Sequence, residues 1–337
     1  MPSRPPTRPR VVHLQRRPSA GQVSIEKVFE HVRTGLTDRF DVDVVVSEQP
    51  NTGVLPRLRA VLAARRAQRD VTHVVGDVHF LVALLRRRTT VLTIHDVEFL
   101  ERAGTSALKK RIYSWVWVRM PVRRAGTVTA VSEATRDSVA ALVGCDSSRI
   151  IVVPNPVREQ FLPAPPVRGP KPVVLLMGTW PSKNLSRSAR ALAGLDCRVV
   201  VTGPLSEDQR AELAHLDVDA RTDLTDAEVV ELLHGCDLLL FPSLHEGFGL
   251  PIVEAQACGR PVVTSDRRPM RDVAGGAACL VDPEDVAAIR AGVVRVLEND
   301  AYRARLVEAG LHNAARYRVD AVARAYGDLY DEVLSRR

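Results

Sequence analysis

Residues 241–266, FPSLHEGFGLPIVEAQACGRPVVTSD, combine a strand, a glycine-containing loop, a helix and a second strand. The apolar run 237–243 ends at Ser243, and Pro251 suits the first turn of a helix. A second β-branched run follows at 260–266. Neither run alternates with polar residues, which indicates strands covered by helices on both faces. This stretch therefore predicts a βαβ unit of a parallel sheet.

The same alternation of apolar runs and helical patterns continues through the rest of the chain. Strands are predicted at 11–15, 42–47, 73–77, 90–96, 127–132, 150–155, 173–178, 197–203, 237–243, 260–266 and 278–283. In the first half, helices are predicted near 22–37, 55–69, 106–123 and 133–142. Parallel strands joined by helices are typical of an α/β fold.

A proline-rich stretch, residues 154–172, interrupts this rhythm and cannot continue a helix or a central strand. The pattern predicts two Rossmann-like, doubly wound parallel-sheet domains that face a central cleft, with this stretch as their linker. We expect an N-terminal domain over 1–157, whose residues 1–10 form a loose tail, and a C-terminal domain over 158–318. A last helix, 319–337, is expected to pack back on the first domain.

The composition, 45% hydrophobic and 26% charged residues, is that of a globular protein. No uninterrupted apolar run reaches about 18 residues, and no apolar core follows the basic start of the chain, which argues against a membrane span and a signal peptide. The cysteines stand apart, which favours reduced thiols in a cytoplasmic protein over disulfides or a zinc site. They are Cys145, Cys197, Cys236, Cys258 and Cys279.

The positive charge is concentrated in the first half of the chain. Residues 1–157 hold 25 Lys and Arg against 14 Asp and Glu, a balance of +11, whereas the remainder holds 22 against 26, a balance of −4. This asymmetry indicates either an anionic partner for the first half or arginines that lie on solvated faces.

The loop before Pro251 carries residues suited to an anionic, hydroxyl-rich ligand. Glycines let backbone N–H groups approach an anion, and the start of a helix adds partial positive charge. Glu246 and Glu254 lie eight residues apart across the junction of loop and helix. They are predicted either to accept hydrogen bonds from ligand hydroxyls, or to be a solvent-facing loop residue and a helix-dipole partner in the first turn.

The segment resembles the signature of the retaining glycosyltransferases of family 4, which have the GT-B fold. The Glu-x7-Glu motif of that family is present as Glu246 and Glu254, and the match extends through EGFGLP, EAQACGRPVV and DVAGGAACLVDP. The resemblance implies that Glu246 and a loop set address the sugar and phosphates of a nucleotide-sugar donor, and that Glu254 holds the ribose hydroxyls. The loop set is Gly247, Phe248, Gly249 and Leu250.

A second match, MGTWPSKNL at 177–185, resembles the phosphate loop of the family. The resemblance places Gly178 and Lys183 at the diphosphate, where lysine acts as a point charge. Thr179 and Ser182 stand where family members often carry arginine, so a second cation is not assigned. Leu224 is implied to cover the nucleotide base through its backbone.

In the first half, TIHDVEFLERAG at 93–104 resembles the T-x-H-D segment of the family. It implies that His95 lies near the transferred sugar, with Asp96 orienting it or capping the next helix. Ser132 is expected to cap the helix that follows it. The loop 15–29 retains one glycine and two arginines that are hypothesised to bind diphosphate or acceptor: Arg16, Arg17 and Gly21.

Residues 108–124 mix Lys and Arg with Trp115 and Trp117. This stretch predicts either a core helix with inward-facing tryptophans or a peripheral contact with the inner face of a membrane. Basic runs at 65–69 and 86–88 add charge to the same domain, but no nucleic-acid recognition motif accompanies them, so a nucleic-acid partner is not expected.

The resemblance implies a metal-independent, retaining hexosyltransferase without cofactors, with His95, Lys183 and Glu246 as its catalytic residues. It would move a sugar from GDP-mannose or a UDP-sugar to a hydroxyl acceptor, in glycan, glycolipid or glycosylated natural-product synthesis. Two alternatives stay open, and the departures in the phosphate loop motivate the first of them. One is a non-catalytic sugar-nucleotide-binding subunit, and the other is a nucleotide-sugar epimerase of the same fold.

Overall fold

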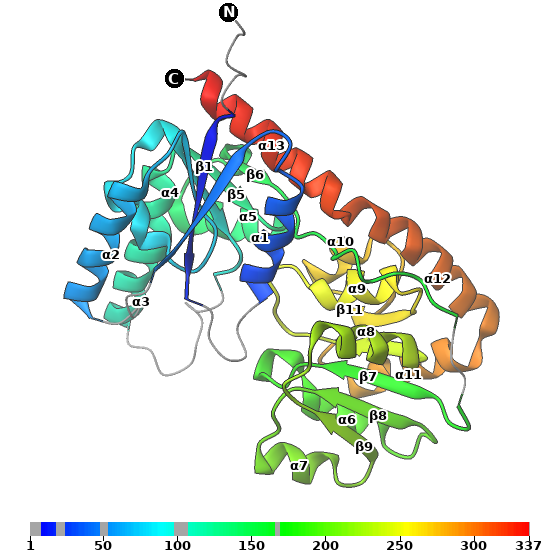
Figure 1. Cartoon of the computed structure of the whole chain (residues 1–337). Coiled ribbons are helices and arrows are strands. Elements are labelled where there is room, and N and C mark those ends of the chain that lie inside the picture. Colours follow the sequence, from blue (N-terminus) through cyan, green and yellow to red (C-terminus); the bar gives the residue numbers. More distant parts are fainter. Residues whose placement is uncertain (1–7, 18–23, 48–52, 98–106, 166–168, 337) are drawn as a thin grey trace, which may run out of the picture. The chain divides into compact units, whose positions relative to one another are not determined.

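The computed structural model describes residues 8–17, 24–47, 53–97, 107–165 and 169–336 (Figure 1). The chain splits into two compact units, one made of residues 1–156 with 319–337 and the other of residues 157–318. Within the described residues, each unit holds one six-stranded sheet whose neighbouring strands are all parallel. The predicted α/β class with two doubly wound parallel sheets is therefore confirmed.

The first unit has a sheet whose inner strands are buried on both faces. In sheet order its strands are β2 (Asp41–Ser47), β1 (Arg10–Arg16), β3 (Val71–Val74), β4 (Thr90–Ile94), β5 (Thr127–Ala130) and β6 (Ile150–Val152). Every residue of β3, β4 and β5 is buried, which explains why their sequences show no polar alternation.

Helices cover both faces of this sheet, with α1 and α13 on one side and α2, α3 and α4 on the other (Figure 1). The stretch predicted as one helix, 106–123, is described from residue 107 on, where it forms a run of three helical segments, the middle one with π-helical geometry. The helices of the unit are α1 (Ser24–Thr34), α2 (Val54–Ala67), η1 (His79–Leu84), η2 (Arg87–Thr89), α3 (Ala107–Tyr113), η4 (Ser114–Arg119), α4 (Met120–Arg124), α5 (Glu133–Val143), η5 (Ser147–Arg149) and α13 (Val319–Ser335). Ser132 caps α5 as predicted, because its Oγ accepts a hydrogen bond from the amide of Thr135.

The last helix, α13, is held on the first sheet by a buried polar network. The Tyr330 hydroxyl lies 2.9 Å from Nε2 of His13 in β1 and 2.7 Å from Nδ1 of His73 in β3. Nε2 of His73 lies 2.7 Å from Oγ1 of Thr93 in β4. Burial lowers the pKa of His13 to about 3 and that of His73 well below its usual value, so both imidazoles are neutral in the folded protein. The helix thereby ties three strands together.

The second unit has a sheet whose strand order reverses between β7 and β10. In sheet order the strands are β12 (Cys279–Val281), β11 (Val262–Ser265), β10 (Leu238–Phe241), β7 (Val173–Met177), β8 (Arg198–Thr202) and β9 (Asp217–Arg221). The chain runs outward from β7 to β9, and then from β10 to β12 on the other side. Ligands of such sheets bind outside the carboxyl ends of the strands at this reversal.

One strand of the second unit departs from expectation, whereas its helices complete the α/β pattern. They are η6 (Pro181–Lys183), α6 (Leu185–Leu192), α7 (Glu207–Leu213), α8 (Asp226–Gly235), α9 (Leu250–Ala257), α10 (Met270–Ala274), α11 (Val286–Glu298), α12 (Asp300–Ala314) and η7 (Ala315–Tyr317). The departure is that β9 precedes α8 at a sheet edge where no strand was predicted. All five cysteines of the chain are free in the structure. Burial raises the pKa of Cys236 and of Cys258 to about 12, so neither thiol is reactive.

None of the helices in the described part of the chain is both long and apolar enough to span a bilayer.

Candidate active site

The two loops at the reversal of the second sheet lie against each other. One loop follows β7 and the other follows β10, so both start at the carboxyl edge of the sheet. The carbonyl oxygen of Ser182 accepts a hydrogen bond from the amide of Leu244 at 2.8 Å, and the hydroxyl oxygen of Ser243 lies 3.1 Å from it. The fold thus brings together the predicted phosphate loop, 177–185, and the glycine-containing loop, 244–249.

Lys183 and Glu246 form an ion pair at the centre of this junction. Nζ of Lys183 lies 2.5 Å from Oε1 of Glu246, and the Ser243 hydroxyl donates to the same oxygen at 2.5 Å. The ammonium group also lies 4.7 Å from the ring centre of Phe241. The two charged side chains are 20% and 14% exposed, so Glu246 is not a solvent-facing loop residue. Lysine has three donors, so it can bind an anion while it keeps its contact with Glu246.

Gly178 makes room for the stem of Lys183. Its φ of +92° lies in the region that favours glycine, and a Cβ there would lie 3.1 Å from both Cγ and Cε of Lys183. We expect Gly178→Ala to displace the ammonium group and to lower nucleotide affinity and activity about tenfold, which titration and steady-state rates would measure.

Gly194→Ala is the matched control for this substitution. Gly194 has a φ of +72° in the same unit, but a Cβ there would meet nothing within 4 Å. The variant Gly194→Ala therefore has the strain of a non-glycine residue at positive φ, but its Cβ does not clash with a neighbouring side chain. Equal losses in the two variants would show that strain, and not displacement of Lys183, causes the effect.

The amino end of α9 is suited to an anion. Gly249, with a φ of +99°, precedes the helix, and no described side chain caps it. Phe248 is buried, with its ring centre 5.5 Å from that of Tyr317, which fixes the loop. A helix start of this kind carries partial positive charge. Because α9 begins at Leu250, Glu254 is its fifth residue, so the predicted position in the first turn is wrong, and so is the dipole-partner interpretation that depended on it.

Glu254 instead contacts an arginine that the sequence did not mark. Nη2 of Arg158 lies 3.4 Å from Oε1 of Glu254, and Nη1 lies 2.6 Å from Oδ2 of Asp226. Arg158 falls in the proline-rich stretch 154–172, where no motif distinguishes it. Asp226 begins α8, two residues after Leu224. The carboxylate expected at the ribose and the segment expected at the base therefore share one guanidinium.

In the first unit, His95 directly follows β4 and is buried. Its Nε2 lies 3.0 Å from the carbonyl oxygen of Val75, and burial lowers its pKa. A carbonyl oxygen only accepts hydrogen bonds, so the neutral ring carries its proton on Nε2 and leaves Nδ1 as the basic nitrogen. The alternative role of Asp96 as a helix cap concerns residues 98–106, which lie outside the described residues.

The arginines proposed for the first loop lie in different environments. Arg16 is largely buried and pairs with Glu26 at 2.7 Å and Asp77 at 2.9 Å. Burial opposes its charge, but the hydrogen bond that Arg16 donates to Glu26 and the charge of Asp77 outweigh this and raise its pKa. Arg17 is exposed, and Gly21 lies outside the described residues.

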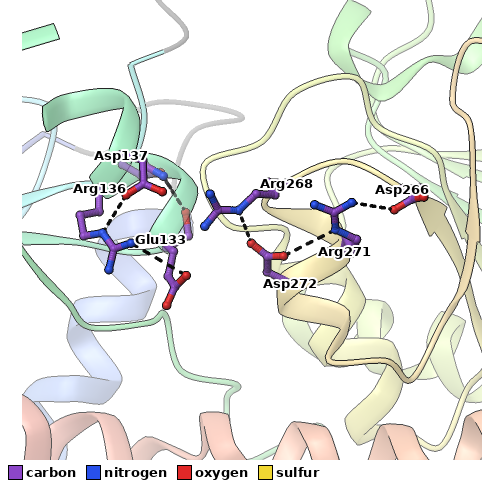
Figure 2. A network of polar contacts seen from close by, with 9 residues as sticks. Glu133, Arg136, Asp137, Asp266, Arg268, Arg271 and Asp272 are labelled. Atoms are coloured by element: carbon purple, nitrogen blue, oxygen red, sulfur yellow. Dashed lines mark hydrogen bonds and ion pairs between the residues drawn. The ribbon is translucent and has the colours of Figure 1, made fainter. Parts of the chain in front are cut away.

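Further ion pairs lie near the carboxyl ends of β5 and β11, and Figure 2 shows those pairs within each unit. Most of these side chains are at least a quarter exposed, so each pair contributes little to stability. In the first unit they join Arg136 to Glu133 and Asp137, and in the second unit they join Arg268 to Asp272 and Arg271 to Asp266 and Asp272.

Two models of known protein families match this chain. The model described as "Glycosyl transferases group 1" matches residues 157–312, and the model described as "Glycosyltransferase Family 4" matches residues 37–161. Two parallel doubly wound sheets are the architecture of the GT-B fold. The chain belongs to glycosyltransferase family 4.

Relatives of this chain include named mannosyltransferases. The chain is 26% identical to the O-antigen chain mannosyltransferase RfbU of Salmonella typhimurium, over 63% of this chain and 61% of that protein. It is 28% identical to the MMP alpha-(1->4)-mannosyltransferase of Mycolicibacterium hassiacum, over 95% of this chain and 82% of that protein. The match to the first relative therefore spans less than two thirds of its length. The fold matches Anabaena Alr3699/HepE in complex with UDP and glucose, with a TM-score of 0.75 at 17% identity, over 96% of this chain and 100% of that one.

Proposed function

We propose that the protein is a retaining glycosyltransferase that moves a sugar from a nucleotide-diphospho-sugar to a hydroxyl acceptor. The observation that carries this proposal is the Lys183–Glu246 pair at 2.5 Å, placed at the reversal of the second sheet beside the start of α9. A cation and a helix start suit a diphosphate, while a carboxylate suits sugar hydroxyls. Family membership supports the same assignment.

Each residue of the site then has a separate task. Lys183 and the start of α9 hold the diphosphate and stabilise its charge as the bond to the sugar breaks, which is the main catalytic effect. Glu246 accepts hydrogen bonds from the sugar, and Glu254 accepts them from the ribose. His95, neutral and with a basic Nδ1, is proposed to lie near the transferred sugar. The acceptor attacks the face that the leaving diphosphate departs from, and that diphosphate helps to remove the acceptor proton.

The donor is proposed to be GDP-mannose, with UDP-sugars as the second choice. Two observations bear on this choice: relatives are named mannosyltransferases, and a structural neighbour holds UDP and glucose. No metal is included, because Lys183 and the helix start supply positive charge to the diphosphate. Activity that is unchanged by EDTA would support this part of the proposal.

The acceptor is proposed to be a glycan or lipid-linked molecule reached by peripheral contact with a membrane. In residues 108–124, Leu108 is 69%, Ile112 54% and Trp115 56% exposed, and basic residues lie among them. Trp117 packs under Arg57 of α2, whose guanidinium lies 4.6 Å from the ring centre. Trp117 therefore packs inward, as predicted for a core helix, whereas Trp115 faces outward, as predicted for a membrane contact. Exposed apolar side chains beside cations suit an anionic bilayer surface.

We expect the protein to sediment with vesicles that contain anionic phosphatidylglycerol and to bind phosphatidylcholine vesicles at least tenfold more weakly. Replacing Leu108 and Ile112 by serine removes about 2–4 kcal/mol of apolar burial and should abolish the binding. Leu162→Ser is the matched control, because Leu162 is 61% exposed in the second unit. Equal binding by both variants would contradict the assignment of this surface.

Analysis of reaction products tests the proposed function directly. The protein is incubated with GDP-mannose or UDP-sugars and candidate acceptors, and the products are identified by NMR. A new glycoside with the anomeric configuration of the donor is the expected result. An isomerised donor would instead show an epimerase, and binding without turnover would show a non-catalytic subunit. An inverted anomeric centre would contradict the retaining mechanism.

A further inference from the structure

Arg158 lies between two carboxylates that come from different elements of the second unit. Its guanidinium contacts Asp226 at 2.6 Å and Glu254 at 3.4 Å. The side chains of Arg158 and Glu254 are only 12% and 9% exposed. Removing one partner of a buried ion pair leaves an uncompensated charge, so the contact restricts where the Glu254 carboxylate can point, whereas Asp226 is 34% exposed.

The backbone and the guanidinium of Arg158 are also held in place by neighbouring residues. The amide of the preceding residue, Val157, donates to the carbonyl oxygen of Tyr317 at 2.7 Å, and the guanidinium lies 4.7 Å from the ring centre of Phe161, which is buried. Asp226 follows Thr225, whose hydroxyl caps α8 by accepting from the backbone amide three residues on. Both ends of the Arg158–Asp226 contact therefore belong to well-defined local structure.

We infer that Arg158 is a positioning residue for nucleoside recognition, which rests on the proposed function. It contacts Oε1 of Glu254, and a carboxylate accepts about four hydrogen bonds, so the contact leaves Glu254 able to accept from ribose hydroxyls. Through Asp226, the same guanidinium links Glu254 to the start of α8 beside Leu224, the segment proposed for the base. Ribose and base recognition are thereby joined by a single side chain.

The inference predicts how affinity depends on the ribose. Titration calorimetry compares GDP with 2′-deoxy-GDP, and UDP with 2′-deoxy-UDP, on the full chain. A hydrogen bond to a charged group contributes about 1.5–3 kcal/mol, so the wild-type protein should prefer the ribonucleotide by about 10- to 100-fold. Arg158→Ala should reduce this preference to about twofold, because Glu254 then loses the contact that positions it for the ribose. Arg158→Lys should restore part of it.

Two further variants separate positioning from a merely structural role. Arg198→Ala is the matched control, since Arg198 pairs with Asp219 at 2.9 Å but is 50% exposed, and its loss should not alter the preference. Combining Arg158→Ala with Glu254→Gln should give no smaller preference than Glu254→Gln alone, because both changes remove the same recognition.

Several outcomes would overturn the inference. An unchanged preference in Arg158→Ala would make the contact structural, and tighter ribonucleotide binding would make Arg158 a competitor of the ribose. If Arg158→Ala does not fold, an unchanged preference in both Asp226→Asn and Arg158→Lys would overturn it equally. Failure of the wild-type protein to bind any nucleotide would instead defeat the proposed function on which the inference rests.

Discussion

Replacement of Lys183 by alanine is expected to lower kcat for sugar transfer by about 10²- to 10³-fold, the usual effect of losing one preorganised charge at a developing anion. The ammonium group is the one side-chain cation that the described residues place on Glu246. Without this ammonium group, no cation of the described residues lies between the carboxylate of Glu246, which Ser243 contacts, and a diphosphate that binds at the site. Steady-state rates and nucleotide titration would measure both effects.

Lys171→Ala is the matched control for this variant. Lys171 belongs to the same unit and pairs with Asp196 at 2.7 Å, but it is 47% exposed and lies before β7. The substitution Lys171→Ala removes one positive charge, as Lys183→Ala does, but at a position away from the site. Activity should therefore stay within about twofold of wild type. Retention of full activity in Lys183→Ala would contradict the assigned role.

Acidification is expected to unfold the protein through its buried histidines. The pKa of His13 is about 3 in the folded state against 6.5 for an ordinary imidazole, because burial disfavours the charge. Below pH 6.5 the unfolded chain takes up a proton that the folded protein does not, so stability falls as the pH drops toward 3. The loss is about 1.4 kcal/mol per pH unit for each such histidine, and about 5 kcal/mol for His13 over the whole window.

Burial lowers the pKa of His73, His79 and His95 as well, so their losses add to that of His13. Domains of this size are stable by about 5–15 kcal/mol, so these losses remove a large part of the stability. Urea unfolding between pH 8 and pH 4 would measure the slope of stability against pH. His13→Asn should reduce that slope by one proton. A flat profile would contradict the account.

Much of the site could be predicted from the sequence because its parts lie at strand ends. In a parallel sheet all carboxyl ends meet at one edge, so the motifs around Lys183 and Glu246 had to lie on the same side of the second unit. Both motifs are also local, with their functional residue types within a few positions of each other. Such signals are readable without knowledge of long-range packing.

The contacts that depend on packing could not be predicted. Arg158 is 96 residues from Glu254, and nothing in its neighbourhood marks it as a partner. The same holds for Tyr330, which is 317 residues from His13. The edge strand β9 was missed because its sequence, DVDAR, alternates with polar residues, unlike the apolar runs of the buried strands.

Prediction of the first loop was limited in a related way. The sequence shows Arg16 but does not show that Glu26 and Asp77 form ion pairs with it. The guanidinium that was hypothesised to bind diphosphate or acceptor is therefore already paired within the protein. Asp77 follows β3, which neighbours β1 in the sheet although it is distant in sequence. Its proximity to Arg16 follows from strand order alone.

A thermal-shift measurement tests the central claim, that the site at the reversal of the second sheet binds a nucleoside diphosphate. The purified protein is heated with GDP, UDP, dTDP or ADP, each with and without EDTA. A ligand at 100 times its Kd stabilises the folded state by about 2.7 kcal/mol, which raises Tm by several degrees. We predict such a rise with at least one nucleotide, unaffected by EDTA, lost in Lys183→Ala and kept in Lys171→Ala. No rise with any nucleotide at millimolar concentration, or an equal rise in Lys183→Ala, would contradict the claim.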